Sequence, residues 1–225
     1  MVASSKQRSR PLTGWRFVAE ELHRAGAVAH LAEPAKTRTL QGRKRRAKTD
    51  RLDALHLRNL LLEGRLPESW IAPTHLLELR SKIRLRKTLV DQRSAWQRRI
   101  HAQLFHHGAP RHPGLLTKDQ RARLGQIELP EAARLQIDTA FALIDAITQL
   151  LGPLERELRS VVRRQAGCRA LMRHYGIGEL TSVAILAELG HARRFSSSRH
   201  AVRFAGLDVT VSESDRRRAP GKLSQ

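Results

Sequence analysis

Two carboxylates three residues apart are the first group in this sequence whose types and spacing could do chemistry. Asp50 and Asp53 follow Thr49, a residue type that often caps the start of a helix. Residues i and i+3 of a helix share a face, so both carboxylates can address one cation. Mg²⁺ prefers oxygen ligands and would accept two carboxylates as part of its shell. The other interpretation is that acidic residues in a first turn only stabilise the helix dipole.

A second candidate is the glycine pair Gly176 and Gly178 in the segment YGIGEL. Glycines directly before a short apolar helix are typical of the hairpin in a helix-hairpin-helix element. Backbone N–H groups at the start of that helix can bind a phosphate. The same pattern also fits a tight turn that binds nothing, and both interpretations stay open.

Hydroxyl, thiol and imidazole groups are the remaining candidates. Ser212 and Ser214 lie beside a basic run, and a serine can attack a phosphodiester if arginines stabilise the developing charge. A solvated serine in a polar segment is the simpler interpretation. The scattered histidines lack metal-site spacing and are expected at the surface. The single cysteine, Cys168, is expected to be buried and inert, in a reduced cytoplasmic protein.

The charge of the chain indicates the class of its partner. Lys and Arg total 42 against 21 Asp and Glu, which gives a formal net charge of +21. Such an excess repels itself unless a polyanion is near, and nucleic acid is the usual polyanion. An anionic membrane surface is the second possibility. No segment has the strong amphipathic profile of a membrane-surface helix, and no apolar run approaches the ~20 residues that span a bilayer, so we expect no membrane partner.

Two basic segments are the expected contacts with nucleic acid. One is a loop expected at residues 36–48, and the other is one face of a long helix expected at residues 74–108. The candidate residues are Arg43, Lys44, Arg45, Arg46 and Lys48 in the loop, and Arg84, Arg86 and Lys87 on the helix.

Helical periodicity predicts most of the elements that must position these residues. Helices are expected at residues 17–25, 49–64, 74–108, 130–165, 180–189 and 197–204, with a bend at Gly152-Pro153. One short strand is expected at Val28 to Ala32, and no obvious partner strand accompanies it. The two long helices predict an antiparallel hairpin, or arms that pair between protomers, and the second has the pattern of a coiled-coil seam.

Three segments together resemble a known family. They are AKTDRLDALHLRNLLLEGRLPESWIAP, LRSKIRLRKTLVDQRSAWQRRIHAQLFHHG and YGIGELTSVAILAELGHARRFSSSRHAVRFAGLDVTVSESDRRRAPG. In this order they resemble the DEDD-type transposases of the insertion-sequence one-ten family, which are related to the Piv site-specific invertases. The likeness extends from Thr13 to the last residue, and its most specific motifs are KTDRLDA and AGLDV-to-PG.

The resemblance implies a divided protein that recombines DNA. The family has a RuvC-like, RNase H-type domain with four acidic metal ligands, a coiled-coil insertion that pairs subunits, and a C-terminal domain with a catalytic serine. Its partners are DNA and an element-encoded guide RNA. Asp50 and Asp53 match the last two acids, with Mg²⁺ as the implied ion. Ser214 best matches the serine, and Ser212 is the alternative.

The resemblance also assigns parts to the chain. Residues 1–11 are expected to be a disordered basic tail, 12–73 a partial RuvC-like domain, 74–165 the long-helix coiled-coil region, and 166–225 a truncated C-terminal serine domain with a helix-hairpin-helix-like element. The expected fold is therefore mainly α, with an α+β remnant.

Departures from the family pattern shape the functional expectation. The family's glutamate precedes a Thr-Gly pair, but Thr13-Gly14 here follows Pro11-Leu12, and no segment supplies the family's first Asp. The chain therefore resembles a transposase shortened at both ends, expected to be incomplete or inactive in strand cleavage and exchange. The alternatives are a non-catalytic nucleic-acid-binding protein, a remnant that interferes with a full-length transposase, or a poorly folded fragment.

Overall fold

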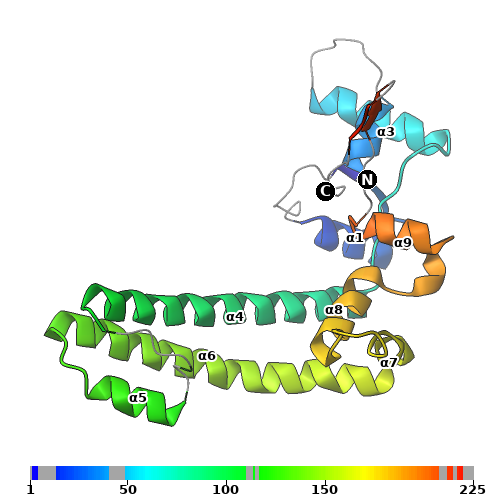
Figure 1. Ribbon diagram of the computed structural model, residues 1–225. Coiled ribbons are helices and arrows are strands. Elements are labelled where there is room, and N and C mark those ends of the chain that lie inside the picture. The colour runs from blue at the N-terminus through cyan, green and yellow to red at the C-terminus, as the bar shows by residue number, and fades with distance from the viewer. Residues whose placement is uncertain are drawn as a thin grey trace. The chain divides into compact units, whose positions relative to one another are not determined.

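The computed structural model describes residues 2–4, 14–40, 49–109, 114, 117–207, 212–214 and 217–219. These residues are mainly helical, as the sequence predicts, and they include four strands of three residues each (Figure 1). The chain divides into two compact units, Met1–Ala72 and Pro73–Gln225. Each unit is described by itself.

The first unit contains a small parallel strand pair. Strand β1 (Val2–Ser4) pairs with β2 (His30–Ala32), and Glu68 adds an isolated antiparallel bridge to Ala32. The expectation that the strand near residue 30 lacks a partner is therefore wrong. Three-residue strands are too short to show the alternation that identifies a strand, and this partner is far away in sequence. Strand β1 lies in the segment assigned to a basic tail; residues 5–13 are outside the described part.

Three helices accompany these strands in the first unit. Helix α1 (Trp15–Arg24) and helix α3 (Asp50–Leu62) match predicted helices. Helix α2 (Pro34–Thr39) is a correction, because the sequence predicts a loop from residue 36. Pro34 occupies the first turn, where its fixed φ suits a helix, and the Thr37 hydroxyl donates a hydrogen bond to the Glu33 carbonyl.

A long helical hairpin dominates the second unit. Helix α4 (Thr74–His106) and helix α6 (Glu131–Arg164) run antiparallel and pack side by side within one chain (Figure 1). Both were predicted, and α6 continues through Pro153. Helix α5 (Lys118–Gly125) was missed; Thr117 caps it by accepting a hydrogen bond from the Gln120 N–H at 3.4 Å.

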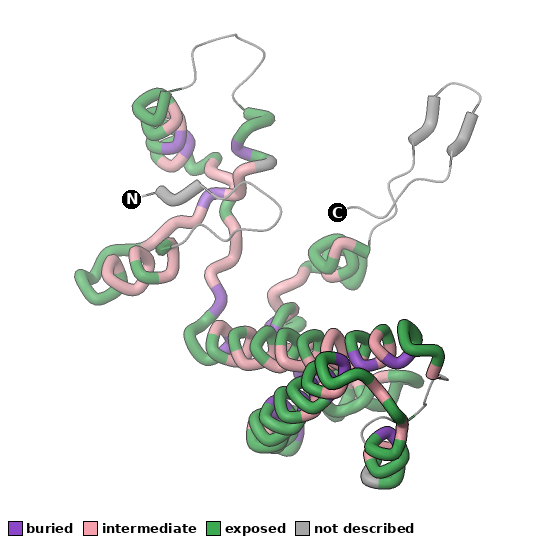
Figure 2. The backbone as a smooth tube through the Cα atoms, turned by 90° about the vertical axis from the view of Figure 1, so that its left-hand side faces the viewer, coloured by how far each residue is buried: buried purple, intermediate pink, exposed green. Residues whose placement is uncertain are grey.

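Two hydrophobic clusters hold the second unit together, and Figure 2 shows buried positions recurring along its helices. The first cluster joins α4, α5 and α6 and consists of Ile100, Leu104, Leu124, Ile137, Ala140 and Ile144. The second joins α6 to α7 (Ala166–Leu171) and α8 (Glu179–Leu189) and consists of Leu158, Val162, Cys168 and Val183. Cys168 is buried, as the sequence predicts.

Helix α6 is apolar on its outer face as well. Leu135 and Leu150 are 67% and 62% exposed, whereas Ile144 between them is fully buried against the hairpin partner. By length and composition alone α6 is apolar enough to cross a membrane. The sequence shows no uninterrupted apolar run here, because polar residues alternate with the apolar ones along the helix. Its inner face packs against α4, as in the core helix of a globular unit.

The remaining elements follow α8. A 3₁₀ turn η1 (Ala192–Arg194) leads to α9 (Ser198–Phe204), and a strand pair, β3 (Ser212–Ser214) and β4 (Arg217–Ala219), comes after it. The predicted ends of α8 and α9 are confirmed. Gly190 ends α8 with φ +66°, and the Ser197 hydroxyl accepts the His200 N–H at 3.2 Å.

Candidate functional site

The acidic pair lies in the first turn of α3. The Thr49 hydroxyl accepts a hydrogen bond from the Leu52 N–H at 3.3 Å and fixes the start of this helix. Asp50 is exposed and Asp53 is half-buried. Because they are three residues apart in a regular helix, the two carboxylates share a face at the surface.

These two carboxylates do not amount to a metal site. Among the residues that the structure describes, no group of three or more His, Cys, Asp or Glu is placed to hold a metal ion. Two carboxylates from one helical turn leave most of the Mg²⁺ shell to other ligands. The described residues therefore do not fit the divalent ion that the family resemblance implies.

The serines belong to the second unit. Strand β3 carries Ser212 and Ser214, which lie opposite Ala219 and Arg217 in the antiparallel pair with β4. Their side chains are outside what the structure describes. The five basic residues predicted in the loop, from Arg43 to Lys48, are also outside the described residues.

The three predicted cations on α4 all contact carboxylates. The Arg86 Nε lies 2.8 Å from Glu155 on α6, and the Lys87 Nζ lies 2.6 Å from Asp91 on α4 itself. Arg84 is more loosely held, at 3.4 Å from Glu188 on α8. The basic face of α4 is therefore partly neutralised by the protein's own acids.

A groove brings several predicted residues together. Its volume is roughly 560 Å³, and residues of α4, α6 and the start of α8 line it. Arg86 and Lys87 come from α4, Arg159 from α6, and Gly178 is the N-cap residue of α8. A helix N-terminus carries a partial positive charge, so the groove lining combines three cations and this weaker positive centre with one carboxylate, that of Glu179.

Arg159 is the groove cation that the sequence did not single out. Its Nη2 lies 3.1 Å from Glu155 and its Nε lies 3.3 Å from Glu179, in the first turn of α8. With Arg86 these residues form an alternating ion-pair ladder, Arg86–Glu155–Arg159–Glu179. An incoming anion can bind there by replacing a carboxylate at an arginine. The only signal in the sequence is the basic end of α6, which also holds many other arginines.

The turn before α8 depends on Gly176. Its φ of +83° is a left-handed conformation that glycine adopts readily and other residues avoid. The Ile177 N–H donates to the His174 carbonyl at 3.2 Å and closes the turn. This geometry aims the chain into α8, so Gly176 shapes the groove without lining it.

Two arginines fix the other end of α8. Arg80 donates from Nε to the Ala187 carbonyl at 2.7 Å and from Nη2 to the Glu188 carbonyl at 2.9 Å. Arg194 donates to the Leu189 carbonyl at 2.8 Å and stacks on Phe195 and Phe204. Burial lowers the pKa of Arg194, and the nearby Arg80 lowers it further. These bonds satisfy terminal carbonyls of α8 and hold the helix in place.

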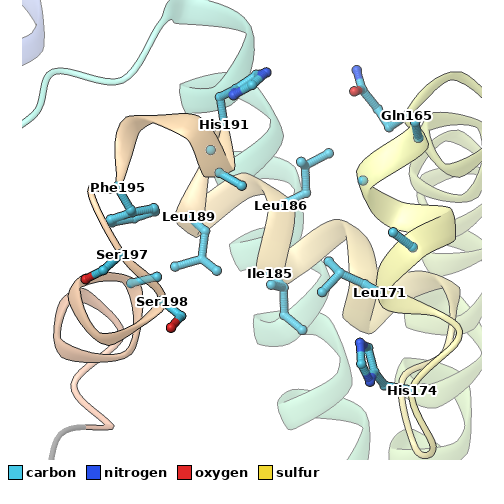
Figure 3. Close-up of a pocket in the computed structure, with 16 residues that line it drawn as sticks. Gln165, Leu171, His174, Ile185, Leu186, Leu189, His191, Phe195, Ser197 and Ser198 are labelled. Carbon is cyan, nitrogen blue, oxygen red and sulfur yellow. The ribbon is translucent and has the colours of Figure 1, made fainter.

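A second, apolar groove lies between α7, α8 and α9 (Figure 3). Its volume is roughly 720 Å³, and Leu171, Ile185 and Leu189 contribute aliphatic walls. Ser197, at its edge, already caps α9. The lining favours contact with apolar groups and is unsuited to a phosphate.

Comparisons with known proteins agree on one family. The family model described as "Transposase IS116/IS110/IS902 family" matches residues 168–225, and the IS110-type DEDD model, described as "Transposase", matches residues 11–107. The chain is also similar to "Putative transposase y4rJ" of Sinorhizobium fredii (strain NBRC 101917 / NGR234), at 27% identity over 246 residues. That alignment covers 92% of this chain and 61% of the relative, so the chain spans about three fifths of its length.

Proposed function

The chain belongs to the IS110 family of insertion-sequence transposases, and from that premise we propose that it binds DNA in the cytoplasm as a transposase polypeptide. The observation that carries this proposal is the groove at the start of α8. Arg86, Lys87 and Arg159 line it together with Glu179, and the helix N-terminus adds to the positive charge of the three cations. Such donors suit backbone phosphates, which accept most protein–DNA hydrogen bonds.

Binding would proceed by exchange within the ion-pair ladder. A DNA phosphate replaces Glu179 or Glu155 as the partner of Arg159, and the first N–H groups of α8 donate to its free oxygens. Contacts of this kind position a duplex and carry no base specificity. Sequence recognition would then come from another partner, and an element-encoded RNA is the one that we propose.

The test compares Arg159→Gln with Arg123→Gln, a matched change of an exposed arginine on α5. We expect Arg159→Gln to weaken duplex DNA binding and to reduce the slope of log affinity against log salt by about 1. The control variant should bind as the unaltered protein does. Equal affinity and slope in both variants would remove the groove from the proposal.

We propose that Ser214 is the serine with which members of this family cleave and exchange DNA strands, and that Ser212 is the alternative. Its hydroxyl oxygen would bond to phosphorus as the bond to the departing strand breaks. Because Asp50 and Asp53 do not complete a metal site among the described residues, we also propose that this chain nicks no DNA by itself. Nicking of supercoiled DNA by the purified protein, abolished in Ser214→Ala, would contradict that inactivity.

Mg²⁺ provides a second check on the acidic pair. Two carboxylates on one exposed turn should bind the ion too weakly to stabilise the fold, so millimolar Mg²⁺ should leave the melting temperature unchanged. Asp50→Asn should behave in the same way. A rise with Mg²⁺ that Asp50→Asn abolishes would show that further ligands complete the site.

We propose that copies of the chain pair through the outer face of α6, in the manner of a coiled coil. Leu135, Leu143 and Leu150 are exposed there. Between residues 126 and 154 the sequence has four acidic residues and one arginine. This segment therefore lacks the positive charge that repels two copies of a +21 chain elsewhere, so the copies can approach each other here. Leu150→Lys should give monomers in sedimentation, whereas Leu85→Lys, at an exposed leucine on α4, should not.

We assign the domains on the same basis. Residues 12–73 would be the partial RuvC-like DEDD domain, 74–165 the coiled-coil arm, and 166–225 the serine domain, whose α7–α8 pair would be the helix-hairpin-helix element. Strand β2 and helices α1 to α3 lie within the first range, while its partner strand β1 lies before residue 12; the single-chain hairpin supports the second assignment.

A non-catalytic role is the second candidate function. The incomplete acidic set together with a well-packed hairpin favours a protein that binds DNA or pairs with an active transposase without cleaving DNA. The nicking assay separates the two functions. If the chain binds DNA but suppresses nicking by an active relative, the interfering role is supported.

A further inference from the structure

Tyr175, the one tyrosine in the sequence, lies on the turn between α7 and α8 (Figure 1). Its relative exposure of 106% is the highest among the exposed large hydrophobic side chains of the described residues. The ring is therefore open to solvent on both faces. Neighbouring His174 lines the apolar groove, and Tyr175 does not.

The backbone beneath this ring is well anchored. The Met172 N–H donates to the Cys168 carbonyl at 3.0 Å, and the His174 N–H donates to the Leu171 carbonyl at 3.0 Å. The bond from Ile177 to His174 closes the turn, and Cys168 belongs to the second hydrophobic cluster. A ring on such a base loses little conformational freedom when it meets a ligand, because only its own χ angles remain to be fixed.

Single exposed apolar side chains are common on proteins and need no explanation. The surroundings of Tyr175 set it apart. Arg173 is exposed, and the structure gives its side chain no partner within the described part of the chain. Arg169 is exposed as well, tethered by a 3.2 Å hydrogen bond to the Arg163 carbonyl at the end of α6. Arg173 thus lies two residues before the ring in the sequence and Arg169 six residues before it, and both side chains are exposed to an incoming anion.

We propose that Tyr175 is a stacking site for an unstacked nucleobase, with Arg173 on the adjoining phosphate. The proposal rests on the proposed nucleic-acid binding, and it specifies that this turn recognises unpaired rather than double-stranded nucleic acid. An aromatic ring beside cations is the arrangement by which proteins bind single strands with little sequence preference. In an intact duplex each base is already stacked on its neighbours, so a frayed end, a flipped base or a single strand is the substrate class.

The competing occupant is an apolar side chain of a protein partner. Charge argues against it. A protein surface would have to leave Arg173 and Arg169 solvated or supply acids for them, whereas one nucleotide supplies both a ring face and a phosphate. The base and the phosphate of a single nucleotide thus satisfy both features of the turn.

The test uses the full chain and one oligonucleotide sequence with 2-aminopurine, prepared as single-stranded DNA, single-stranded RNA and duplex DNA. Stacking on Tyr175 should quench the fluorescence of the single strands on binding. Tyr175→Ala should lower single-strand affinity by about 5–150-fold and remove the quench, and Tyr175→Phe should retain both. Duplex affinity and the salt slope should change little, because no phosphate contact is lost.

Phe105→Ala is the matched control. Phe105 is 84% exposed, lies in the last turn of α4 and is followed by His106 and His107, so it tests whether any exposed aromatic beside basic residues has this effect. Its loss should leave single-strand binding and the quench unchanged.

Three results would overturn the inference. One is an unchanged single-strand affinity in Tyr175→Ala, and another is an equal loss for single strands and duplex. A third is an effect of Phe105→Ala as large as that of Tyr175→Ala. In each of these cases DNA binding itself stands; absence of all nucleic-acid binding would remove the proposed function and this inference together. The DNA and RNA arms show which strand the site prefers.

Discussion

Arg80 and Arg84 lie one turn apart on α4, yet their surroundings give them different roles. Arg80 is 15% exposed and donates to two terminal carbonyls of α8. Arg84 is 68% exposed and, among the described residues, its ion-pair partner is Glu188. In the sequence both belong to one basic face, and only the contacts with α8 separate a structural arginine from an exposed one.

We expect Arg80→Met to lower the free energy of unfolding by about 1.5–3 kcal/mol, since it removes charged hydrogen bonds and leaves two carbonyls unpaired. Arg84→Met should change it by less than about 0.5 kcal/mol. Denaturant midpoints of the two variants give the comparison. Equal midpoints would show that the end of α8 is held by Arg194 and packing alone.

The pair between Arg121 and Asp145 predicts a pH dependence. The guanidinium donates two hydrogen bonds, of 2.7 and 2.6 Å, and so lowers the pKa of Asp145. Stability from this pair is therefore complete above about pH 3.9, the usual pKa of an unfolded Asp, and is lost as the pH falls through the lower folded value.

Because Asp145 is half exposed, the pair should contribute at most about 1 kcal/mol. Asp145→Asn should be less stable than the unaltered protein at about pH 6, and the difference should shrink as the pH falls below about 3.9. Urea unfolding at the two pH values measures it. A difference that grows on acidification would contradict the assignment.

At the scale of elements, the two faces of α6 make the clearest contrast. Ile144 is fully buried in the first hydrophobic cluster, while its neighbour Leu143 is exposed on the outer face. Ile144→Ala should cost about 2–5 kcal/mol through lost burial and a cavity. Leu143→Ala should cost much less in the monomer. Thermal unfolding at low protein concentration separates monomer stability from pairing; similar losses would show that both faces are covered.

The long and well-capped elements were predictable from the sequence. Thr49, Gly108 and Gly190 mark the ends of α3, α4 and α8 by local chemistry that needs no tertiary information. Helices α2 and α5, and the pairing of β1 with β2, were not predictable. They have three to eight residues, too few for a period to show, and the strand pair depends on a partner distant in sequence.

The candidate site was predictable only in its parts. Glycine spacing indicated the start of α8, and the basic face indicated Arg86 and Lys87. They meet Arg159 only because α4 packs against α6. The hydrogen bond between Arg86 and Glu155, for example, joins residues that are 69 positions apart in the sequence. Periodicity defines a face of a helix, but it does not say which other helix covers that face.

At the scale of the whole molecule, the net charge of +21 sets the response to salt. If DNA binding neutralises roughly 6–10 phosphates, affinity should fall by about 10³–10⁵ between about 50 and about 200 mM salt. A disordered polycation would show the same loss of affinity with salt, so thermal unfolding of the protein must be measured as well. We expect a sharp transition that moves to higher temperature with DNA. A broad, unresponsive melt would favour a poorly folded fragment.

The length of the hairpin has a mechanical consequence. Helix α4 has 33 residues and is therefore roughly 50 Å long at 1.5 Å per residue. The second hydrophobic cluster braces it at the end near α8, and the first braces it at the far end. A helix of this length amplifies small rotations, because a rotation of about 10° at the end near α8 moves the other end by roughly 9 Å. A slight repacking beneath α8 would thus displace the far end of the hairpin by a distance equal to the length of several helical residues.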